Sequence, residues 1–136
     1  AKTSNVIPIT EKEMTRFNIS LEGGVDVVLW AIENAMGGEI FVPKIPSYNI
    51  ETVAKAIAPN AKLEYVGIRP GEKIHEEMIT SSDSFYTIDT GKYFAILPAG
   101  ANKQKYIDFY KATCVPKGFC YNSGENTEWI NVKQMR

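Results

Sequence analysis

The chain has few of the side chains from which metal and redox sites are built. Its 136 residues include one histidine, His75, and two cysteines, Cys114 and Cys120. The cysteines lie six positions apart, which allows a disulfide but matches no zinc or redox motif, so we expect free thiols in a reducing cytoplasm. A zinc site would need carboxylates or ligands from outside the chain. We therefore predict no metal ligand.

Charge of one sign and long apolar runs are also missing. The net charge is −1 with both signs interspersed, so we expect no basic stripe and no nucleic-acid partner. No apolar run approaches the roughly 20 residues that span a bilayer. The first residues, AKTSNVIPIT, lack the apolar segment of a signal peptide. We expect no membrane partner and a cytoplasmic location.

The motifs of common catalytic sites are absent as well. No glycine-rich turn of the G-x-G-x-x-G type follows a strand, so nothing in the chain is expected to bind a dinucleotide. No tyrosine is followed by a lysine four residues later, and there is no nucleophile elbow or phosphate-binding loop. The residues alone therefore predict ligand binding, but no catalytic residue and no cofactor-binding residue.

The first half of the chain alternates strand and helix patterns. Apolar residues recur at helical spacing after Ser20, which suits an N-cap, and Gly37-Gly38 is a natural stop. The alternation is typical of an α/β protein, although the strands are too short for a complete doubly wound sheet. The predicted strands cover 6–9, 16–19, 39–45 and 62–68, and the predicted helices cover 21–36 and 47–60.

The second half continues with weaker patterns. After Glu72 we predict a short helix with Ile74 and Met78 on its inner face. Aromatic and β-branched residues on both sides of Gly91 predict two strands hinged there. A helix is predicted over 102–113, and the remaining tail is expected to be mostly loop.

A charged turn, Arg69-Pro-Gly-Glu72, is the strongest candidate for a binding site. Proline at the second position and glycine at the third fit a type II turn, which would hold Arg69 with little freedom left to lose. A fixed guanidinium suits a diphosphate, because it offers two parallel donors and a permanent charge. Glu72 could orient that arginine or accept hydrogen bonds from a ribose hydroxyl. The alternative is a surface turn with an ion pair worth well under about 1 kcal/mol.

Other polar and aromatic residues have two interpretations each. Arg16, at the start of a predicted strand, could point into a cleft or cap the edge of a sheet. His75 is expected to be solvated or ion-paired rather than catalytic, because three glutamates lie close to it in sequence. Trp30 is expected in the core. Aromatic side chains that could stack on a base or sugar are Tyr48, Tyr65 and Trp129.

Four blocks, in order, resemble one enzyme family. They are PITEKEMTRFNISLEGGVDVVLWAIE, GGEIFVPKIPSYNIETVAKAIAP, IRPGEKIHEEMI and YNSGENTEW. The family is the nucleotide-sugar dehydratases of the extended short-chain dehydrogenase/reductase superfamily. Within it, the chain is most similar to the inverting UDP-N-acetylglucosamine 4,6-dehydratases, which begin pseudaminic acid synthesis for flagellin and other surface glycans.

The resemblance implies that residues 1–136 are a fragment, the C-terminal nucleotide-sugar-binding region of a longer enzyme. The Rossmann domain, which would hold NADP and carry a catalytic Tyr-x-x-x-Lys pair, is expected to be absent from this chain. In such enzymes the sugar is oxidised at C4, water leaves across C5–C6, and the hydride returns to C6 with inversion at C5. The fragment alone is expected to be inactive, and a homo-oligomer is expected.

The resemblance also gives the arginines a role. It implies that Arg16 and Arg69 bind the diphosphate of a UDP-sugar, and that Glu72 contacts the uridine ribose or orients an arginine. Two alternatives remain open. One is a free-standing module that binds a nucleotide sugar without turning it over. The other is an assembly piece with no ligand, which would expose a large apolar face.

Overall fold

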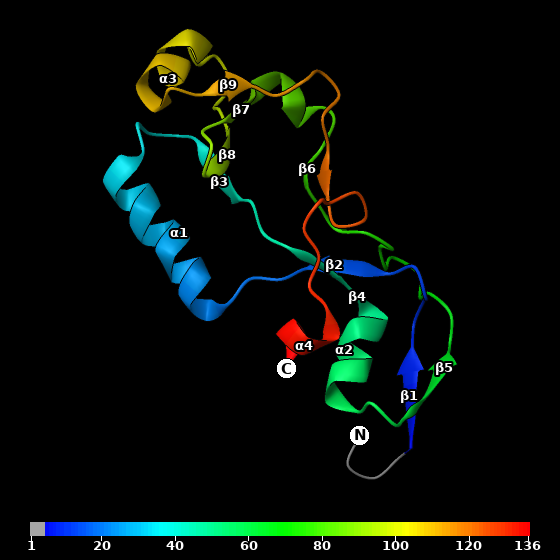
Figure 1. Ribbon diagram of the computed structural model, residues 1–136. Helices are drawn as coiled ribbons and strands as arrows, with labels where there is room; N and C mark the ends of the chain where they lie inside the picture. Colours follow the sequence, from blue (N-terminus) through cyan, green and yellow to red (C-terminus); the bar gives the residue numbers. More distant parts are fainter. Residues whose placement is uncertain (1–4) are drawn as a thin grey trace. The chain divides into compact units, whose positions relative to one another are not determined.

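The computed structural model describes residues 5–136, which form two compact units built from interleaved stretches of the chain. Unit 1 contains residues up to Asn18, Ile45–Glu76 and Asn122–Arg136, and unit 2 contains Ile19–Lys44 and Glu77–Tyr121. Figure 1 traces the chain through both units. Helices and strands are mixed, so the predicted α/β class is confirmed at that level. The prediction that 1–136 serve as a single nucleotide-sugar-binding region stays a prediction.

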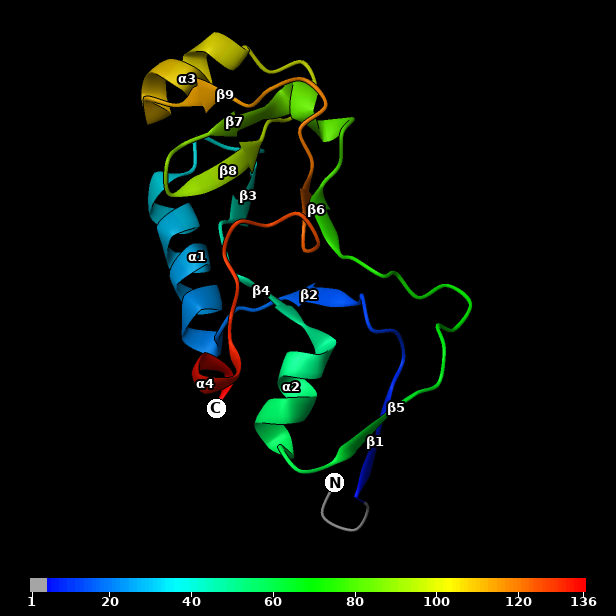
Figure 2. The ribbon, with the colours of Figure 1, turned by 45° about the vertical axis from the view of Figure 1, so that its right-hand side comes forward.

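Unit 1 is held by two separate strand pairs. β1 and β5 are parallel, with Val6 opposite Lys62, and β2 and β4 are antiparallel. Figures 1 and 2 both show β1 and β5 side by side. A helical turn near the C-terminus, α4, packs against α2. The elements of this unit are β1 (Val6–Ile9), β2 (Thr15–Phe17), β4 (Ser47–Asn49), α2 (Ile50–Ile57), β5 (Lys62–Tyr65) and α4 (Val132–Met135).

The sequence explains why α2 forms where it does. Asn49 is the N-cap, and its side chain accepts a hydrogen bond from the backbone N–H of Glu51 at 2.8 Å. Apolar residues at helical spacing then face β1, and Ala54 is buried. The helix ends two residues before Pro59, which cannot continue it. The predicted helix is confirmed, although its first three residues form strand β4.

Unit 2 is built on a four-stranded sheet in the order β3-β8-β7-β9, in which all neighbouring strands are antiparallel. β7 and β8 form the predicted hairpin, and Gly91 has φ +86°, a conformation that favours glycine. β10 (Tyr121–Asn122) starts at the last residue of this unit and pairs with β6. The other elements are α1 (Leu21–Asn34), β3 (Ile40–Pro43), β6 (Glu77–Ile79), η1 (Asp83–Tyr86), β7 (Thr87–Asp89), β8 (Tyr93–Ile96), α3 (Lys103–Tyr110) and β9 (Thr113–Cys114).

The core of unit 2 lies between this sheet and α3. Ile88 and Ala95 are fully buried and belong to one cluster with Leu97 and Ala112. Aromatic and aliphatic side chains of α3 pack on the same cluster. Trp30 of α1 meets Phe41 edge to face, with ring centroids 5.0 Å apart. Trp30 is half-buried against this ring and is not among the buried core residues, so the expectation that it lies in the core is met only in part.

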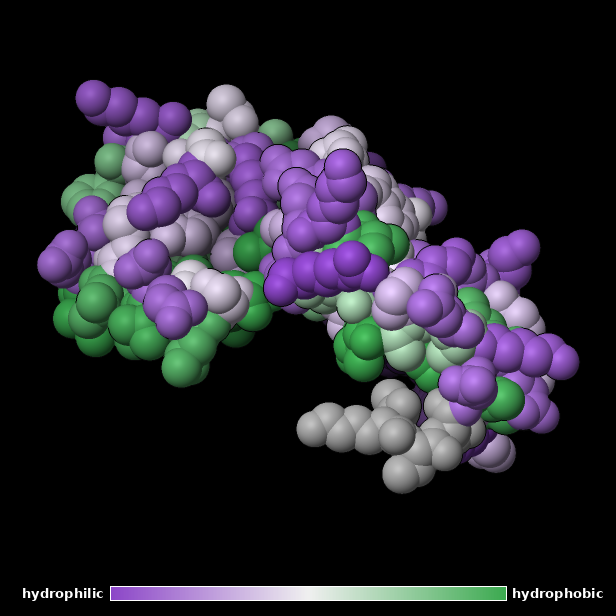
Figure 3. All heavy atoms as spheres, turned by 60° about the horizontal axis from the view of Figure 1, so that its bottom comes forward, coloured by the Kyte–Doolittle hydropathy of each residue, from purple (hydrophilic) through white to green (hydrophobic). Residues whose placement is uncertain are grey.

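Helix α1 differs from its expected packing. Ser20 caps it as predicted, since its hydroxyl accepts from the N–H of Gly23 at 3.0 Å. The apolar stripe, however, is exposed: Leu21 is 82% exposed and Ile32 is 76% exposed. Figure 3 shows hydrophobic side chains gathered on the side where α1 lies in Figure 1. The helix contacts the rest of unit 2 through Trp30 and through the Asn34 carbonyl, which accepts from the Tyr110 hydroxyl, whereas Leu21 and Ile32 are exposed.

Two other expectations were wrong in detail. The helix predicted after Glu72 does not form, and β6 lies there instead. The carbonyls of Lys73 and Ile74, which an α-helix would use internally, accept hydrogen bonds from Arg16. Helix α1 also ends at Asn34, before the glycine pair, because the Glu39 carboxylate takes the N–H groups that follow.

Within the described residues, no helix is both long enough and apolar enough to cross a bilayer.

We expect two isoleucine substitutions to differ in their effect on the free energy of unfolding. Ile88→Ala should lower the free energy of unfolding by about 2–5 kcal/mol, because the side chain is fully buried and leaves a cavity. Ile32→Ala, on the exposed stripe of α1, should change it by less than about 0.5 kcal/mol. Urea unfolding followed by circular dichroism measures both. Comparable losses in the two variants would mean that α1 packs through its apolar stripe.

Candidate functional site

The turn that carries Arg69 has the expected geometry. The backbone N–H of Glu72 donates to the Arg69 carbonyl at 3.1 Å, which closes a β-turn. Gly71 has φ +85°, as the third position of a type II turn requires. The Glu72 carboxylate accepts a hydrogen bond from the backbone N–H of Arg69 at 3.0 Å. Residues 69 and 72 are thus joined by two hydrogen bonds, one from the backbone N–H of each.

This geometry bears on what the two charged residues can do. Glu72 fixes the backbone of Arg69, and among residues 5–136 no hydrogen bond or salt bridge joins the two side chains. The Arg69 residue is exposed, and its guanidinium has no hydrogen bond or ion pair in the described part of the chain. All five of its N–H groups are therefore available to a ligand.

Arg16 lies in the same unit and is much more constrained. One of its terminal nitrogens donates to the carbonyls of Thr15 at 2.6 Å and Ile74 at 3.1 Å, and the other donates to Lys73 at 3.0 Å. Its Nε lies 3.4 Å from a carboxylate oxygen of Glu76, forming a salt bridge. The side chain is only 24% exposed. Arg16 therefore joins strand β2 to the segment that follows the Arg69 turn.

Counting donors separates the two arginines. A guanidinium carries five N–H groups in a planar fork. Arg16 commits three of them to carbonyls and directs a fourth toward Glu76, which leaves one for a ligand. The Arg16 guanidinium thus reaches Lys73, which lies four positions beyond Arg69. The Arg16 side chain is held by several hydrogen bonds, whereas the Arg69 side chain has none among the described residues.

Strand pairing adds an aromatic residue to this region. Arg16 of β2 lies directly opposite Tyr48 of β4 in the antiparallel register. Residues opposite each other project to the same face, with Cβ atoms about 5 Å apart. Sequence reasoning included Tyr48 as a stacking candidate, but only the register places it beside Arg16.

Sequence reasoning missed Thr15, Ser123 and Gly124. The Thr15 hydroxyl lies 2.8 Å from Nδ1 of His75 and 2.7 Å from the hydroxyl of Ser123. The ring of His75 lies against Gly124. These contacts link three of the four sequence blocks. None of the three residues belongs to a recognisable motif, so the sequence alone could not have identified them.

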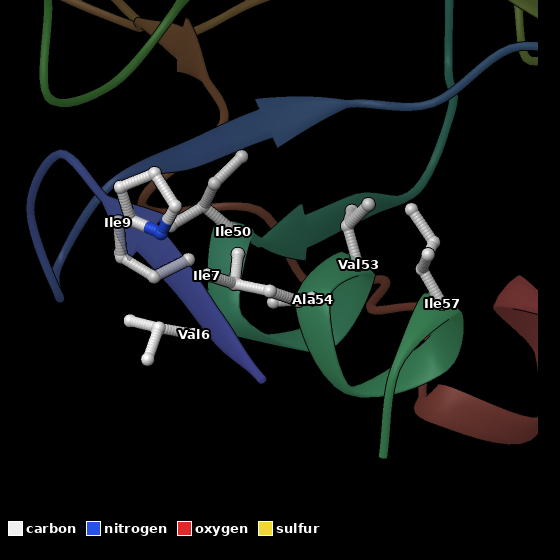
Figure 4. Close-up of a pocket in the computed structure, with 8 residues that line it drawn as sticks. Val6, Ile7, Ile9, Ile50, Val53, Ala54 and Ile57 are labelled. Carbon is white, nitrogen blue, oxygen red and sulfur yellow. The ribbon is translucent and has the colours of Figure 1, made fainter. Parts of the chain in front are cut away.

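An apolar groove lies elsewhere in unit 1. It has a volume of about 300 Å³, and Figure 4 shows its side chains coming from β1 and α2. No charged or hydroxyl-bearing side chain lines it, so it does not suit a diphosphate. Its lining residues are Val6, Ile7, Pro8, Ile9, Ile50, Val53, Ala54 and Ile57.

The remaining candidates are committed to local contacts. Tyr65 donates a hydrogen bond to the Glu51 carboxylate, and this bond raises the pKa of Tyr65. The indole N–H of Trp129 donates to the carbonyl of Asn126 at 2.7 Å. Both cysteines are free thiols, which confirms that expectation. Among residues 5–136, no three His, Cys, Asp or Glu side chains are grouped in a way that could hold a metal ion.

Comparison with known families identifies the chain's relatives. A family model described as "Polysaccharide biosynthesis protein" matches residues 1–98. The chain belongs to this family. Its membership fits the extended short-chain dehydrogenase/reductase assignment inferred from the four blocks.

Curated relatives support the closer resemblance. The chain is 45% identical to a UDP-N-acetylglucosamine 4,6-dehydratase (inverting) of Campylobacter jejuni, serotype O:23/36, over 99% of the chain and 42% of the relative. It is 46% identical to the enzyme of the same name from serotype O:2, over 95% of the chain and 40% of the relative. The resemblance stated from the sequence is confirmed. The chain spans about two fifths of the length of these relatives.

More distant relatives are named for a different reaction. A UDP-glucose 4-epimerase of Rickettsia typhi is 36% identical over 99% of the chain and 41% of its own length. Among solved structures, Pen from Bacillus thuringiensis has a TM-score of 0.76 and 26% identity, covering 99% of this chain and 41% of that one. Both units therefore have counterparts in longer proteins.

Replacing Arg16 by lysine should reveal its structural role. Lysine keeps the charge but is a point donor, so it cannot reach three carbonyls at once. We expect Arg16→Lys to lower the free energy of unfolding by about 1–3 kcal/mol. Arg136→Lys is the matched control, because Arg136 makes a single 3.3 Å bond to the Ala56 carbonyl. Equal effects in urea unfolding would contradict the role assigned to Arg16.

Proposed function

We propose that this chain is the substrate-binding portion of a C5-inverting, NADP-dependent UDP-N-acetylglucosamine 4,6-dehydratase that acts in surface glycan synthesis. The observation that carries the proposal is 45% identity to an inverting dehydratase over 99% of the chain. The coverage of 42% of that relative supports a role as one part of a longer enzyme. On this proposal the chain alone is inactive.

The relatives share a class of substrate but differ in the reaction for which they are named. Dehydratases at 45–46% identity and epimerases at 33–36% identity differ in reaction, but every name specifies a UDP-sugar. A region shared by both groups is best suited to bind what their substrates share, the uridine diphosphate. The higher identity to the dehydratases favours dehydration over epimerisation for the whole enzyme.

Arg69 is the principal diphosphate ligand on this proposal. Its guanidinium is exposed, has five free donors within the described residues, and is fixed at its backbone by a closed turn. Pre-organisation lowers the entropy that binding must offset. Arg16 supplies at most one donor and mainly holds residues 73–76 in place. Glu72 holds the turn, and its carboxylate keeps acceptor capacity for a ribose hydroxyl.

The residues described here do not suit NADP, because none forms a glycine-rich turn that would cradle a dinucleotide. In the whole enzyme the cofactor would store a hydride temporarily, held by residues outside this chain. What these residues contribute is orientation: anchoring the diphosphate fixes the attached sugar, so that remote binding energy positions the reacting carbons.

The remaining parts of the proposal concern the cell. Inverting dehydratases of this kind would supply pseudaminic acid for flagellin or capsule, in the cytoplasm and as homo-oligomers. The exposed stripe of α1 favours association with another protein surface, which fits a part of a longer, oligomeric enzyme. The second candidate is a free-standing module that binds a nucleotide sugar without catalysis.

Binding of UDP tests the role of Arg69. We expect Arg69→Ala to weaken UDP binding about tenfold to a hundredfold, since charge-assisted hydrogen bonds to phosphate contribute about 1.5–3 kcal/mol. Uridine, which lacks the diphosphate, should bind both proteins equally. Arg136→Ala removes the same charge elsewhere and serves as the control. Calorimetry showing equal losses for both variants would exclude Arg69 as the diphosphate ligand.

The coding DNA upstream of the Ala1 codon separates the enzyme from the free-standing module. We expect a continuous reading frame that encodes a glycine-rich nucleotide-binding turn and a Tyr-x-x-x-Lys pair. A stop codon followed by a start codon next to Ala1 would refute the enzyme. The arginines would then be studied as a binding site in their own right.

A further inference from the structure

A chain of side-chain hydroxyls connects the backbone near Glu76 to the imidazole of His75. Ser123 Oγ accepts a hydrogen bond from the backbone N–H of Glu76 at 2.9 Å. It lies 2.7 Å from Thr15 Oγ1, which lies 2.8 Å from His75 Nδ1. Ser123 is fully buried, and Thr15 is 5% exposed. All four residues belong to unit 1.

Counting protons gives this relay a direction. A backbone N–H can only donate, so Ser123 must accept from Glu76, and its own proton needs an acceptor. Among the described residues, Thr15 Oγ1 is the acceptor within reach. The Thr15 proton then goes to His75 Nδ1, because an Nδ1–H donor would leave the buried Thr15 proton without an acceptor among the described residues. The reverse direction would leave the buried Ser123 proton without a partner, which native structures rarely tolerate.

The direction determines the state of the ring. Because Nδ1 accepts, the neutral imidazole must carry its proton on Nε2. We propose that His75 is a positioning residue of the arginine site, locked as the Nε2–H tautomer by the Ser123–Thr15 relay. The relay fastens the segment after the Arg69 turn to strand β2. This proposal rests on the proposed function only where it concerns the ligand.

The location of His75 makes it suited to this task. The carbonyls of the two residues before it accept from Arg16, and the residue after it pairs with the same guanidinium. The N–H of Thr15 also donates to the Ile74 carbonyl at 2.9 Å. Arg16 holds this segment through two backbone carbonyls and the Glu76 carboxylate. The relay adds a bond to a further side chain of the segment, that of His75.

Gly124 completes the arrangement. A Cβ added there would lie 2.6 Å from Nδ1 and 2.7 Å from Cγ of His75. Both distances are shorter than any tolerated contact, so an alanine would displace the ring. The φ of Gly124 is not in the left-handed region, and the ring alone therefore demands glycine.

The tautomer can be observed directly because His75 is the only histidine in the chain. Long-range ¹⁵N–¹H correlation spectra, recorded near pH 8.5 where an ordinary imidazole is neutral, distinguish the two ring nitrogens. We expect a single Nε2–H tautomer in the unsubstituted chain. An Nδ1–H ring, or the averaged pattern of a free histidine, would overturn the relay without any variant.

Substitutions then test the contacts one by one. Thr15→Val should release the ring to the averaged pattern, whereas Thr15→Ser should keep it locked. Thr127→Val, at an exposed hydroxyl, is the matched control. Gly124→Ala should likewise release the ring, while Gly24→Ala, which meets open space, should not. A locked ring in either Thr15→Val or Gly124→Ala would contradict the assignment.

Ligand affinity separates this proposal from the proposed function. If the chain binds UDP, Gly124→Ala should weaken binding about threefold to tenfold and Gly24→Ala should leave it unchanged. Unchanged affinity with a released ring would overturn the positioning role. A locked ring in a chain that does not bind UDP at all would leave the relay intact and count against the proposed function.

Discussion

The unit that carries the candidate site depends on one guanidinium. Arg16 donates to the carbonyl of its own neighbour and to two carbonyls almost 60 residues away, and it faces Glu76. A planar cation is suited to this because several carbonyls can converge on its fork. Without it, the two carbonyls in a loop with no regular secondary structure, those of Lys73 and Ile74, would lose a side-chain donor, and the Thr15 carbonyl in β2 would lose one as well. The Arg69 turn lies between this loop and β5, and both attach it to the rest of unit 1.

Most of the local structure could be predicted from the sequence. The cap at Ser20, the glycine hinge at Gly91 and the apolar spacing of α2 are local signals, and each gave an element in the expected place. The predictions that failed concern segments whose backbone bonds to residues far away in the sequence. The segment after Glu72 has helical spacing, but its carbonyls are used by a residue in another strand, which overrides the local preference.

The candidate site likewise contains features that the local sequence predicts and features that depend on distant residues. The Arg69 turn follows from Pro70 and Gly71, because their backbone preferences act within four residues. The different freedom of the two arginines does not follow, since it depends on which carbonyls lie within reach of Arg16. Nor does the pairing of Thr15 with Ser123, which are 108 residues apart. The binding roles of Arg16, Arg69 and Glu72 themselves remain predictions.

The interleaved order of the two units has a consequence for synthesis. Unit 2 ends at Tyr121, so all of its residues exist before residues 122–136 are made. Unit 1 must wait, because Ser47 forms backbone bonds to Glu128 and Ile130, and Thr15 needs Ser123. The strand pair β2–β4 is therefore made early but gains these bonds only when residues 123–130 have been made. On a ribosome, which releases N-terminal residues first, the segments that flank the arginines stay open to other proteins until residues 123–130 have emerged.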